Sequence, residues 1–161
     1  MTNFILGITG ASGSGKSYLS NLIHNKFYPN SVIISQDNYY LSHDYLPLKQ
    51  RGKLNFDTPS MIDWNLIKTH LSLLKNSSPV QTPQYSFKTH MRLKRKKLIQ
   101  PKKLIIFEGI FALNEIVRPI LSYKVYLDTD MSICFQRRLN RDINERGRTK
   151  SSVITQFEAT T

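Results

Sequence analysis

The chain has few acidic side chains, one cysteine and no long apolar run. Its 161 residues include 11 aspartates and glutamates against 23 lysines and arginines, a formal net charge of +12. The single cysteine, Cys134, excludes an intrachain disulfide, and its place in a helical pattern predicts a small buried side chain. The lack of a long apolar run excludes a membrane span, and the amino terminus lacks the pattern of a secretory signal. We expect one cytoplasmic domain over residues 1–161.

The excess of basic side chains indicates a surface that attracts polyanions, such as nucleotides, nucleic acid or acidic lipid. Charge alone does not choose among these partners. The run Lys94-Arg95-Lys96-Lys97 is typical of a solvated strand edge, which favours that interpretation over a nucleic-acid interface. Whether copies of the chain form a homo-oligomer stays open.

Apolar runs and helical patterns alternate along the chain. Runs rich in aliphatic and aromatic residues predict buried strands at 4–8, 32–35, 104–107 and 125–127. Helical patterns occupy about 17–26, 61–75, 113–121 and 131–144. This alternation predicts an α/β fold with a doubly wound parallel sheet, in which ligands bind beyond the carboxyl ends of the strands.

Two segments do not fit the alternation. Residues 79–100 contain two extended stretches joined by a turn, which predicts a small β-hairpin inserted beside the main sheet. Residues 41–59 are polar, contain Pro47 and Pro59, and read as a long surface loop of the kind that is usually functional.

The first predicted strand leads into a glycine-rich loop that opens a helix. Its sequence, GASGSGKS, fits GxxxxGK[ST], the phosphate loop of P-loop NTPases, and a flexible Gly/Ser turn is the less favoured alternative. The loop backbone and side chains are expected to hold the phosphates of ATP, with the lysine on the outer phosphates and the last serine on Mg²⁺. The residues concerned are Gly10, Ser12, Gly13, Ser14, Gly15, Lys16 and Ser17.

An acid follows each of two predicted strands. Asp37 comes just past the strand at 32–35, where a carboxylate can accept a proton from an attacking hydroxyl or help to hold the metal. Glu108 directly follows the strand at 104–107, the position from which kinases and nucleotide hydrolases position Mg²⁺. Asp37 alone also fits a helix or turn cap, and the metal role of Glu108 is favoured only together with the phosphate loop.

Five arginines fall within residues 137–148. Helical spacing places Arg138, Arg141 and Arg148 on one face, and opposite them lie the apolar side chains Ile133, Leu139 and Ile143. The pattern predicts an arginine-rich lid helix over 131–150, packed by its apolar side and presenting guanidinium groups outward. Gly147 near its end suits a lid that closes over a bound triphosphate, and a solvated basic face is the alternative.

Six motifs occur in a fixed order along the chain: GASGSGKS, SQDNYY, NFDTPSMIDW, YSFKTHMR, IIFEGIFAL and RRLNRDINERGR, the last followed by Gln156-Phe157. Together they resemble the uridine kinase family (uridine-cytidine kinases) of P-loop nucleoside kinases, from Phe4 to Gln156. The ordered set is more specific than the phosphate loop alone. The resemblance implies transfer of the γ-phosphoryl group of ATP to the 5′-hydroxyl of uridine or cytidine, with Mg²⁺, as in pyrimidine salvage.

The resemblance also implies roles for single residues. Asp37 would be the base that takes the proton of the 5′-hydroxyl, with Lys16 and Arg138 as further catalytic residues, and Arg141 and Arg146 resemble the lid's contacts to ATP. The residues that resemble contacts to the nucleoside are Tyr40, Phe56, Asp57, Tyr85, Phe87, His90, Arg138, Arg148 and Gln156. Taken alone, the paired aromatics on one strand face are also typical of core, and a lone histidine of the surface.

The chain departs from the family pattern at three places. Ala11 stands where the family usually has a second glycine, Ser86 replaces a common aspartate between two pocket aromatics, and the carboxyl end is short relative to the family. Two rival functions stay open. One is a kinase for another riboside such as nicotinamide riboside, because Ser35-Gln36-Asp37 also resembles that family, and the other is a nucleotide-binding module without catalysis.

Overall fold

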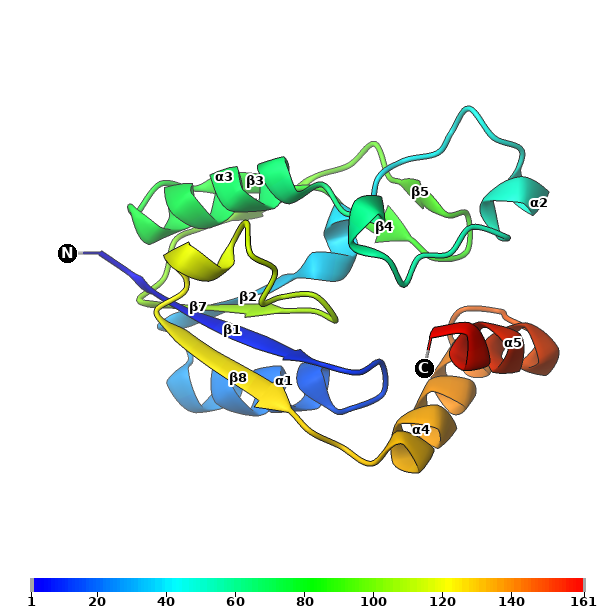
Figure 1. The fold of residues 1–161 in the computed structure, drawn as a ribbon. Helices are drawn as coiled ribbons and strands as arrows, with labels where there is room; N and C mark the ends of the chain where they lie inside the picture. Colours follow the sequence, from blue (N-terminus) through cyan, green and yellow to red (C-terminus); the bar gives the residue numbers. More distant parts are fainter. Residues whose placement is uncertain (1, 161) are drawn as a thin grey trace.

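Four parallel strands form the central sheet, in the order β2-β7-β1-β8 (Figure 1). In a computed structural model, which describes residues 2–160 and the side chains of residues 2–158, their bounds are Phe4–Gly10 (β1), Ser31–Ser35 (β2), Leu104–Glu108 (β7) and Tyr123–Leu127 (β8). Each lies within two residues of the predicted run. The parallel sheet predicted from the apolar runs is therefore confirmed.

Helices cover both faces of this sheet. Helix α1 (Lys16–Phe27) lies on one face and helix α3 (Trp64–Lys75) on the other (Figure 1). The inner side chains of α3 are fully buried in one cluster with strand residues such as Ile5 and Ile105. Burial of apolar surface on both faces stabilises the sheet and confirms the predicted doubly wound α/β arrangement of P-loop NTPase type.

The segment at 79–100 forms two short antiparallel pairs beside the sheet. Strands β3 (Val80–Thr82) and β6 (Lys97–Ile99) pair, and beyond them β4 (Tyr85–Ser86) pairs with β5 (Met91–Arg92). This confirms the predicted hairpin. Its far end lies near the carboxyl ends of the main strands (Figure 1).

The long loop after β2 carries only short helical turns. A 3-10 turn, η1 (Gln36–Tyr39), follows β2, and the loop then contains α2 (Leu48–Arg51) and a second 3-10 turn, η2 (Pro59–Met61). The loop is fastened to α3 by Trp64, whose indole Nε1 donates to the carbonyl oxygen of Pro59 at 2.8 Å.

Two predicted helices differ in the structure. The helix expected at 61–75 begins at Trp64, because the side chain of Asp63 caps it by accepting a hydrogen bond from the backbone N–H of Leu66. The prediction of a helix at 113–121 is wrong, since only a 3-10 turn, η3 (Arg118–Ile120), forms there. The side chain of Asn114 accepts from the N–H of Ile116, and a proline at the start of η3 supplies no N–H, so the segment turns instead.

The arginine-rich segment forms two helices instead of one. Helix α4 (Met131–Asn144) has the bounds of the helical pattern, but the lid helix predicted to reach residue 150 ends there, and α5 (Lys150–Thr160) follows. Gly147, at φ 67°, lies in the turn between them, where glycine reaches left-handed backbone without strain. Both helices lie at the carboxyl ends of the sheet strands (Figure 1).

The orientation predicted for α4 is also wrong. Its buried side chains are Cys134, Arg138 and Asp142, whereas Ile133 and Ile143 are exposed. Arg138 and Arg141 therefore face inward, where carboxylates meet them, and Ile133 and Ile143 face outward. Arg137 is exposed, and Leu139 is half-buried. The buried position predicted for Cys134 is confirmed. Among residues 2–160, no helix has the length and apolar character needed to cross a membrane.

Candidate active site

The phosphate loop lies at the tip of β1 and leads into α1. Gly13 has φ 86°, and a Cβ atom there would lie 2.3 Å from the backbone oxygen of Cys134, so the loop and helix α4 are in direct contact. The hydroxyl of Thr129 donates to the backbone carbonyl oxygen of Ser14 at 3.0 Å, which is a second link between the loop and the segment that leads into α4. Within residues 2–160, only Ser77 and His90 are non-glycine residues with positive φ, so Ala11 needs no glycine-like backbone.

Lys16 is buried beside the loop and has no carboxylate within ion-pair distance among the described residues. Its Nζ donates to the carbonyl oxygens of Gly10 at 2.9 Å and Ala11 at 2.7 Å. Burial lowers the pKa of Lys16, and the nearby acids Glu108 and Asp37 oppose this shift. A lysine held by neutral carbonyls at a phosphate loop is placed to meet the charge of an incoming phosphate.

Glu108 lies at the tip of β7 next to the start of α1. The hydroxyl of Ser17 donates to its Oε2 at 3.3 Å. Burial raises the pKa of Glu108, with opposition from a hydrogen bond of Ser35, and Asp37 nearby adds to the rise. A hydroxyl and two carboxylates are oxygen donors of the kind that Mg²⁺ takes alongside phosphate oxygens and water, so Ser17, Glu108 and Asp37 fit this metal.

Asp37 lies in η1, just past β2, and its carboxylate faces Arg146 in the turn between α4 and α5. Its Oδ2 accepts from Nη2 of Arg146 at 3.4 Å, and its side chain keeps 37% of its surface exposed. The guanidinium of Arg146 also lies over the ring of Phe87, with its central carbon 3.7 Å from the ring centre. The two distant segments that carry Asp37 and Arg146 therefore meet at one point.

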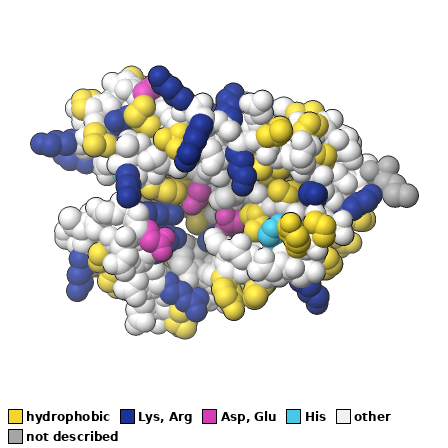
Figure 2. Space-filling model, turned by 180° about the vertical axis from the view of Figure 1, so that it is seen from behind, with side chains coloured by type: hydrophobic (Ala, Val, Ile, Leu, Met, Phe, Trp, Pro, Cys, Tyr) yellow, Lys and Arg dark blue, Asp and Glu magenta, His cyan; other side chains and the backbone are white. Residues whose placement is uncertain are grey.

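One cleft of about 300 Å³ joins the phosphate loop to the strand-tip acids and the lid. The sequence-predicted residues along its wall are Ser12, Gly13, Gly15, Lys16, Ser17, Asp37, Tyr40, Asp57, Glu108, Arg138, Arg141 and Arg146. Figure 2 shows this arrangement from behind: acidic side chains lie in a central hollow with lysines and arginines around them. The structure thus brings together most of the residues predicted for ATP, metal and proton transfer, while Gly10 and Ser14 of the phosphate loop do not line the cleft.

A second, smaller pocket of about 50 Å³ adjoins the cleft at Tyr40, Asp57, Arg138 and Arg146. Its aromatic wall includes Tyr40, Phe56 and Phe87, and the ring centre of Tyr40 lies 5.5 Å from that of Phe56 and 6.1 Å from that of Phe87. The predicted contact Tyr85 packs against Tyr40, with ring centres 5.3 Å apart, but does not line the pocket. The ring of His90 is stacked on Phe56 at 4.9 Å. Ligand pockets usually have about 300–1,000 Å³, so side chains that now fill this pocket, Arg146 among them, must move before a ligand of nucleoside size enters.

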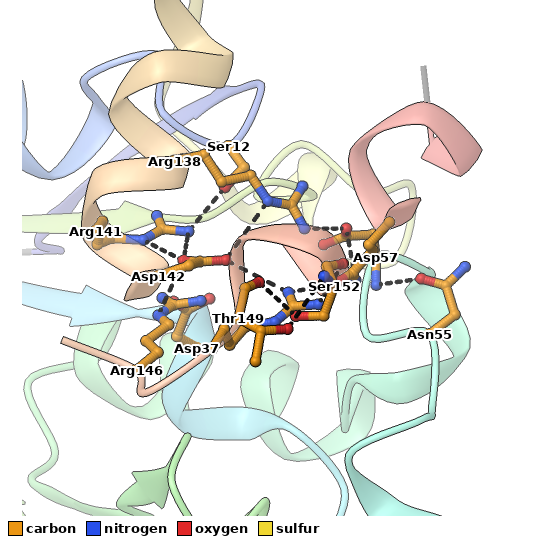
Figure 3. A network of polar contacts seen from close by, with 12 residues as sticks. Ser12, Asp37, Asn55, Asp57, Arg138, Arg141, Asp142, Arg146, Thr149 and Ser152 are labelled. Carbon is orange, nitrogen blue, oxygen red and sulfur yellow. Dashed lines mark hydrogen bonds and ion pairs between the residues drawn. The ribbon is translucent and has the colours of Figure 1, made fainter. Parts of the chain in front are cut away.

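Asp57 is held between helices α4 and α5 (Figure 3). Its Oδ2 accepts from Nη2 of Arg138 at 2.7 Å and from Nε2 of Gln156 at 2.9 Å. Arg148 in turn donates to the side-chain oxygen of Gln156 and to the carbonyl oxygen of Ser152, so α5 is tied to the same network. The predicted nucleoside contacts Asp57, Arg138, Arg148 and Gln156 are therefore in one place.

Two residues beside the site were not singled out from the sequence. Asp142 is buried among the lid arginines, and Arg137 donates to the carbonyl oxygen of Gly13 at 3.5 Å and lines the cleft. Asp142 follows Arg138 by four residues, the spacing of an ion pair on a helix, which was the available signal. It was hidden by the assumption that the apolar side of the helix faces the core.

A phosphate loop at the tip of a parallel sheet, facing two acids and an arginine-rich lid, defines a P-loop kinase. The chain belongs to the Phosphoribulokinase / Uridine kinase family, whose model matches residues 5–161. A protein named uridine kinase from Yersinia pestis (strain Pestoides F) is 40% identical to this chain, and the alignment covers 97% of this chain and 76% of that protein. The family resemblance inferred from the ordered motifs is confirmed.

Solved structures with lower identity share the fold. A protein described as a putative fructose transport system kinase from Silicibacter sp. TM1040 matches with a TM-score of 0.79 and 20% identity, covering 98% of this chain and 80% of that one. Phosphoribulokinase from Rhodobacter spheroides matches with a TM-score of 0.67 and 13% identity, covering 96% of this chain and 62% of that one. At such identities the likeness concerns the fold alone.

Proposed function

We propose that residues 1–161 form a nucleoside kinase domain that transfers the γ-phosphoryl group of ATP to the 5′-hydroxyl of uridine or cytidine. The observation that carries the proposal is the junction at Asp37. Its carboxylate borders the cleft that contains Lys16, and its partner Arg146 lies on Phe87 in the adjoining aromatic pocket. A donor in the cleft and an acceptor in the pocket would meet at this carboxylate.

The smaller pocket supplies the acceptor side of this scheme. Aromatic faces at Tyr40, Phe56 and Phe87 suit stacking on a planar base. Asp57 would accept hydrogen bonds from ribose hydroxyls in exchange for part of its bonding with Arg138 and Gln156, and its position on the wall of both the cleft and the pocket supports this role. The uridine kinase of Yersinia pestis is named for this type of substrate, which supports the proposal.

In the proposed step, the 5′-oxygen of the nucleoside bonds to the γ-phosphorus while the bond from that phosphorus to the β,γ-bridging oxygen breaks. The proton of the 5′-hydroxyl goes to the carboxylate of Asp37, and ADP leaves. Lys16, Arg141 and Arg146 offset the charge on the phosphates through the change, and loop and lid align donor and acceptor. When bound by Ser17 and Glu108, Mg²⁺ supplies further charge neutralisation to the phosphate oxygens.

The charge around the aromatic pocket favours a neutral base over the pyridinium ring of nicotinamide riboside. Arg138, Arg146 and Arg148 line this pocket. Burial lowers the pKa of His90, and positive charge from Arg148, Arg51 and Arg146 lowers it further. A cationic base would meet the same repulsion, whereas uracil and cytosine carry no charge.

The test is ADP release from ATP with uridine, cytidine and nicotinamide riboside offered in separate assays. We expect release with a pyrimidine nucleoside and much less with nicotinamide riboside. 5′-Deoxyuridine, which lacks the acceptor oxygen, is the matched control and should give only the background rate. Release with nicotinamide riboside alone would replace the proposed substrate, and ATP binding without release from any nucleoside would replace the proposed activity by a binding function.

A further inference from the structure

Asp142 is the most enclosed charged residue of the lid, with 1% of its surface exposed. Four arginines form ion pairs with its carboxylate, and Figure 3 shows Arg138, Arg141 and Arg146 beside it. Oδ1 lies 2.8 Å from Nη2 of Arg141 and 3.8 Å from Nε of Arg146, and Oδ2 lies 3.4 Å from Nη1 of Arg148 and 3.7 Å from Nε of Arg138. One carboxylate thus fixes the distances among four guanidinium groups that would otherwise repel one another.

Each of these arginines also reaches a second group that borders the cleft or the pocket. Arg141 donates to the hydroxyl of Ser12 in the phosphate loop at 3.1 Å, and Arg146 donates to Asp37. On the other side, Arg138 and Arg148 reach Asp57 and Gln156, which are also among the proposed contacts of the nucleoside. Among the side chains of residues 2–158, the carboxylate of Asp142 is therefore the single group that forms ion pairs with the arginines of both the donor side and the acceptor side.

Electrostatics makes the presence of this acid informative. A negative charge among arginines that face a triphosphate lowers the affinity for that triphosphate, because like charges repel. If the lid served only to hold ATP, a neutral side chain would serve it better. An acid at this point is explained when the geometry of the guanidinium groups matters more than their total positive charge.

We propose that Asp142 is a positioning residue of the phosphoryl transfer: it orients the lid arginines toward donor and acceptor, and it does so at a cost in ATP affinity. This inference rests on the proposed function for its kinetic part. It concerns a residue that acts through Arg138, Arg141, Arg146 and Arg148 and touches neither substrate.

The experiment compares four proteins: wild type, Asp142→Asn, Asp142→Glu and Glu145→Gln. Glu145 is the matched control, an exposed acid at the end of the same helix with no ion pair among the described residues. ATP affinity is measured by calorimetry in the absence of a nucleoside. Turnover is measured by ADP release with uridine or cytidine. Both measurements are made below the unfolding temperature of each protein.

For Asp142→Asn we expect turnover to fall about tenfold or more while ATP binds about threefold tighter. Asp142→Glu keeps the charge and shifts it by one methylene, so turnover should fall about fivefold with ATP affinity within about twofold of wild type. Glu145→Gln should change neither quantity by more than about twofold. A residue that only stabilises the fold would lower the unfolding temperature without this opposite movement of turnover and affinity.

The proposal is overturned if Asp142→Asn keeps the turnover of wild type, or if its ATP affinity falls together with turnover. Should Asp142→Asn fail to fold, Asp142→Glu decides the matter, and an unchanged turnover there is the contrary result. The binding measurement needs no nucleoside. If the wild type releases ADP with none of the offered nucleosides, that result counts against the proposed function. Weaker ATP binding by Asp142→Asn counts against the role of Asp142 in either case.

Discussion

The phosphate loop and the lid balance their charges in opposite ways. Around the loop, charged groups meet neutral ones: Lys16 is bonded to backbone carbonyls and Glu108 to the hydroxyl of Ser17. In the lid, charged groups meet opposite charges, with Arg138 on Asp57 at 2.7 Å and Arg146 on Asp37 at 3.4 Å. In the proposed function, the loop would take phosphate and metal without losing an ion pair, whereas the arginines of α4 and of the turn after it would exchange a carboxylate for a substrate.

The largest effect is expected from removing the charge at the loop. Lys16→Met should lower turnover by about 10³-fold, because no other cation replaces the one that faces the transferred phosphoryl group. Lys26→Met, at the exposed end of the same helix, is the control and should leave turnover within about twofold. ADP release with uridine measures both, and a fall of less than about tenfold in Lys16→Met would show that lid arginines can substitute for the loop.

The next largest effect is expected where the two regions meet. Asp37→Asn removes the proposed base and the ion pair with Arg146, so turnover should fall about 10²-fold or more while ATP affinity stays nearly the same. Turnover and ATP binding are measured separately. Asp44→Asn, an exposed acid in the following loop, is the matched control. An unchanged turnover in Asp37→Asn would remove this residue from the mechanism.

A third change tests the contact between loop and lid through the backbone. Gly13→Ala places a Cβ 2.3 Å from the oxygen of Cys134 and strains a positive φ, so the free energy of unfolding should drop by about 2 kcal/mol or more. At Gly52, φ is −64° and the nearest atom to an added Cβ is 3.6 Å away, so Gly52→Ala should stay within about 1 kcal/mol of wild type. Denaturant unfolding compares the two, and equal stabilities would mean that the contact yields easily.

The smallest effect concerns the pH dependence of stability without magnesium. Because burial raises the pKa of Glu108 above its ordinary 4.5, the folded protein holds this proton more tightly than the unfolded chain does. The contribution of Glu108 to stability should therefore decline as the pH rises from 4.5 through the raised value.

Glu108→Gln should remove this decline, and the measurement is denaturant unfolding of variant and wild type from pH 4.5 to neutral pH. Glu115→Gln, an exposed acid after the same strand, should keep the wild-type slope. An equally steep decline in Glu108→Gln would show that other groups cause the pH dependence. It would also weaken the contrast between Glu108, which has no ion pair among the described residues, and the acids that pair with arginines.

Local patterns predicted the strands, the phosphate loop and the bounds of α4, because these depend on short-range periodicity and turn chemistry. The same patterns failed where distant residues decide. Arg138 faces inward because Asp57, 81 positions away, meets it there, and no spacing within the helix reveals that contact. The wrong orientation of α4 and the overlooked Asp142 have this one cause. The helix predicted at 113–121 failed for a local reason instead, at Asn114 and Pro119.

The chain contains one tryptophan, and its position is useful. Trp64 is buried at the start of α3 and hydrogen-bonded to Pro59, at the end of the loop that also carries Phe56 and Asp57. Its emission spectrum can therefore report, without any attached dye, when the loop that carries Phe56 and Asp57 rearranges. A stopped-flow trace at the red edge of protein absorption would follow that rearrangement in real time.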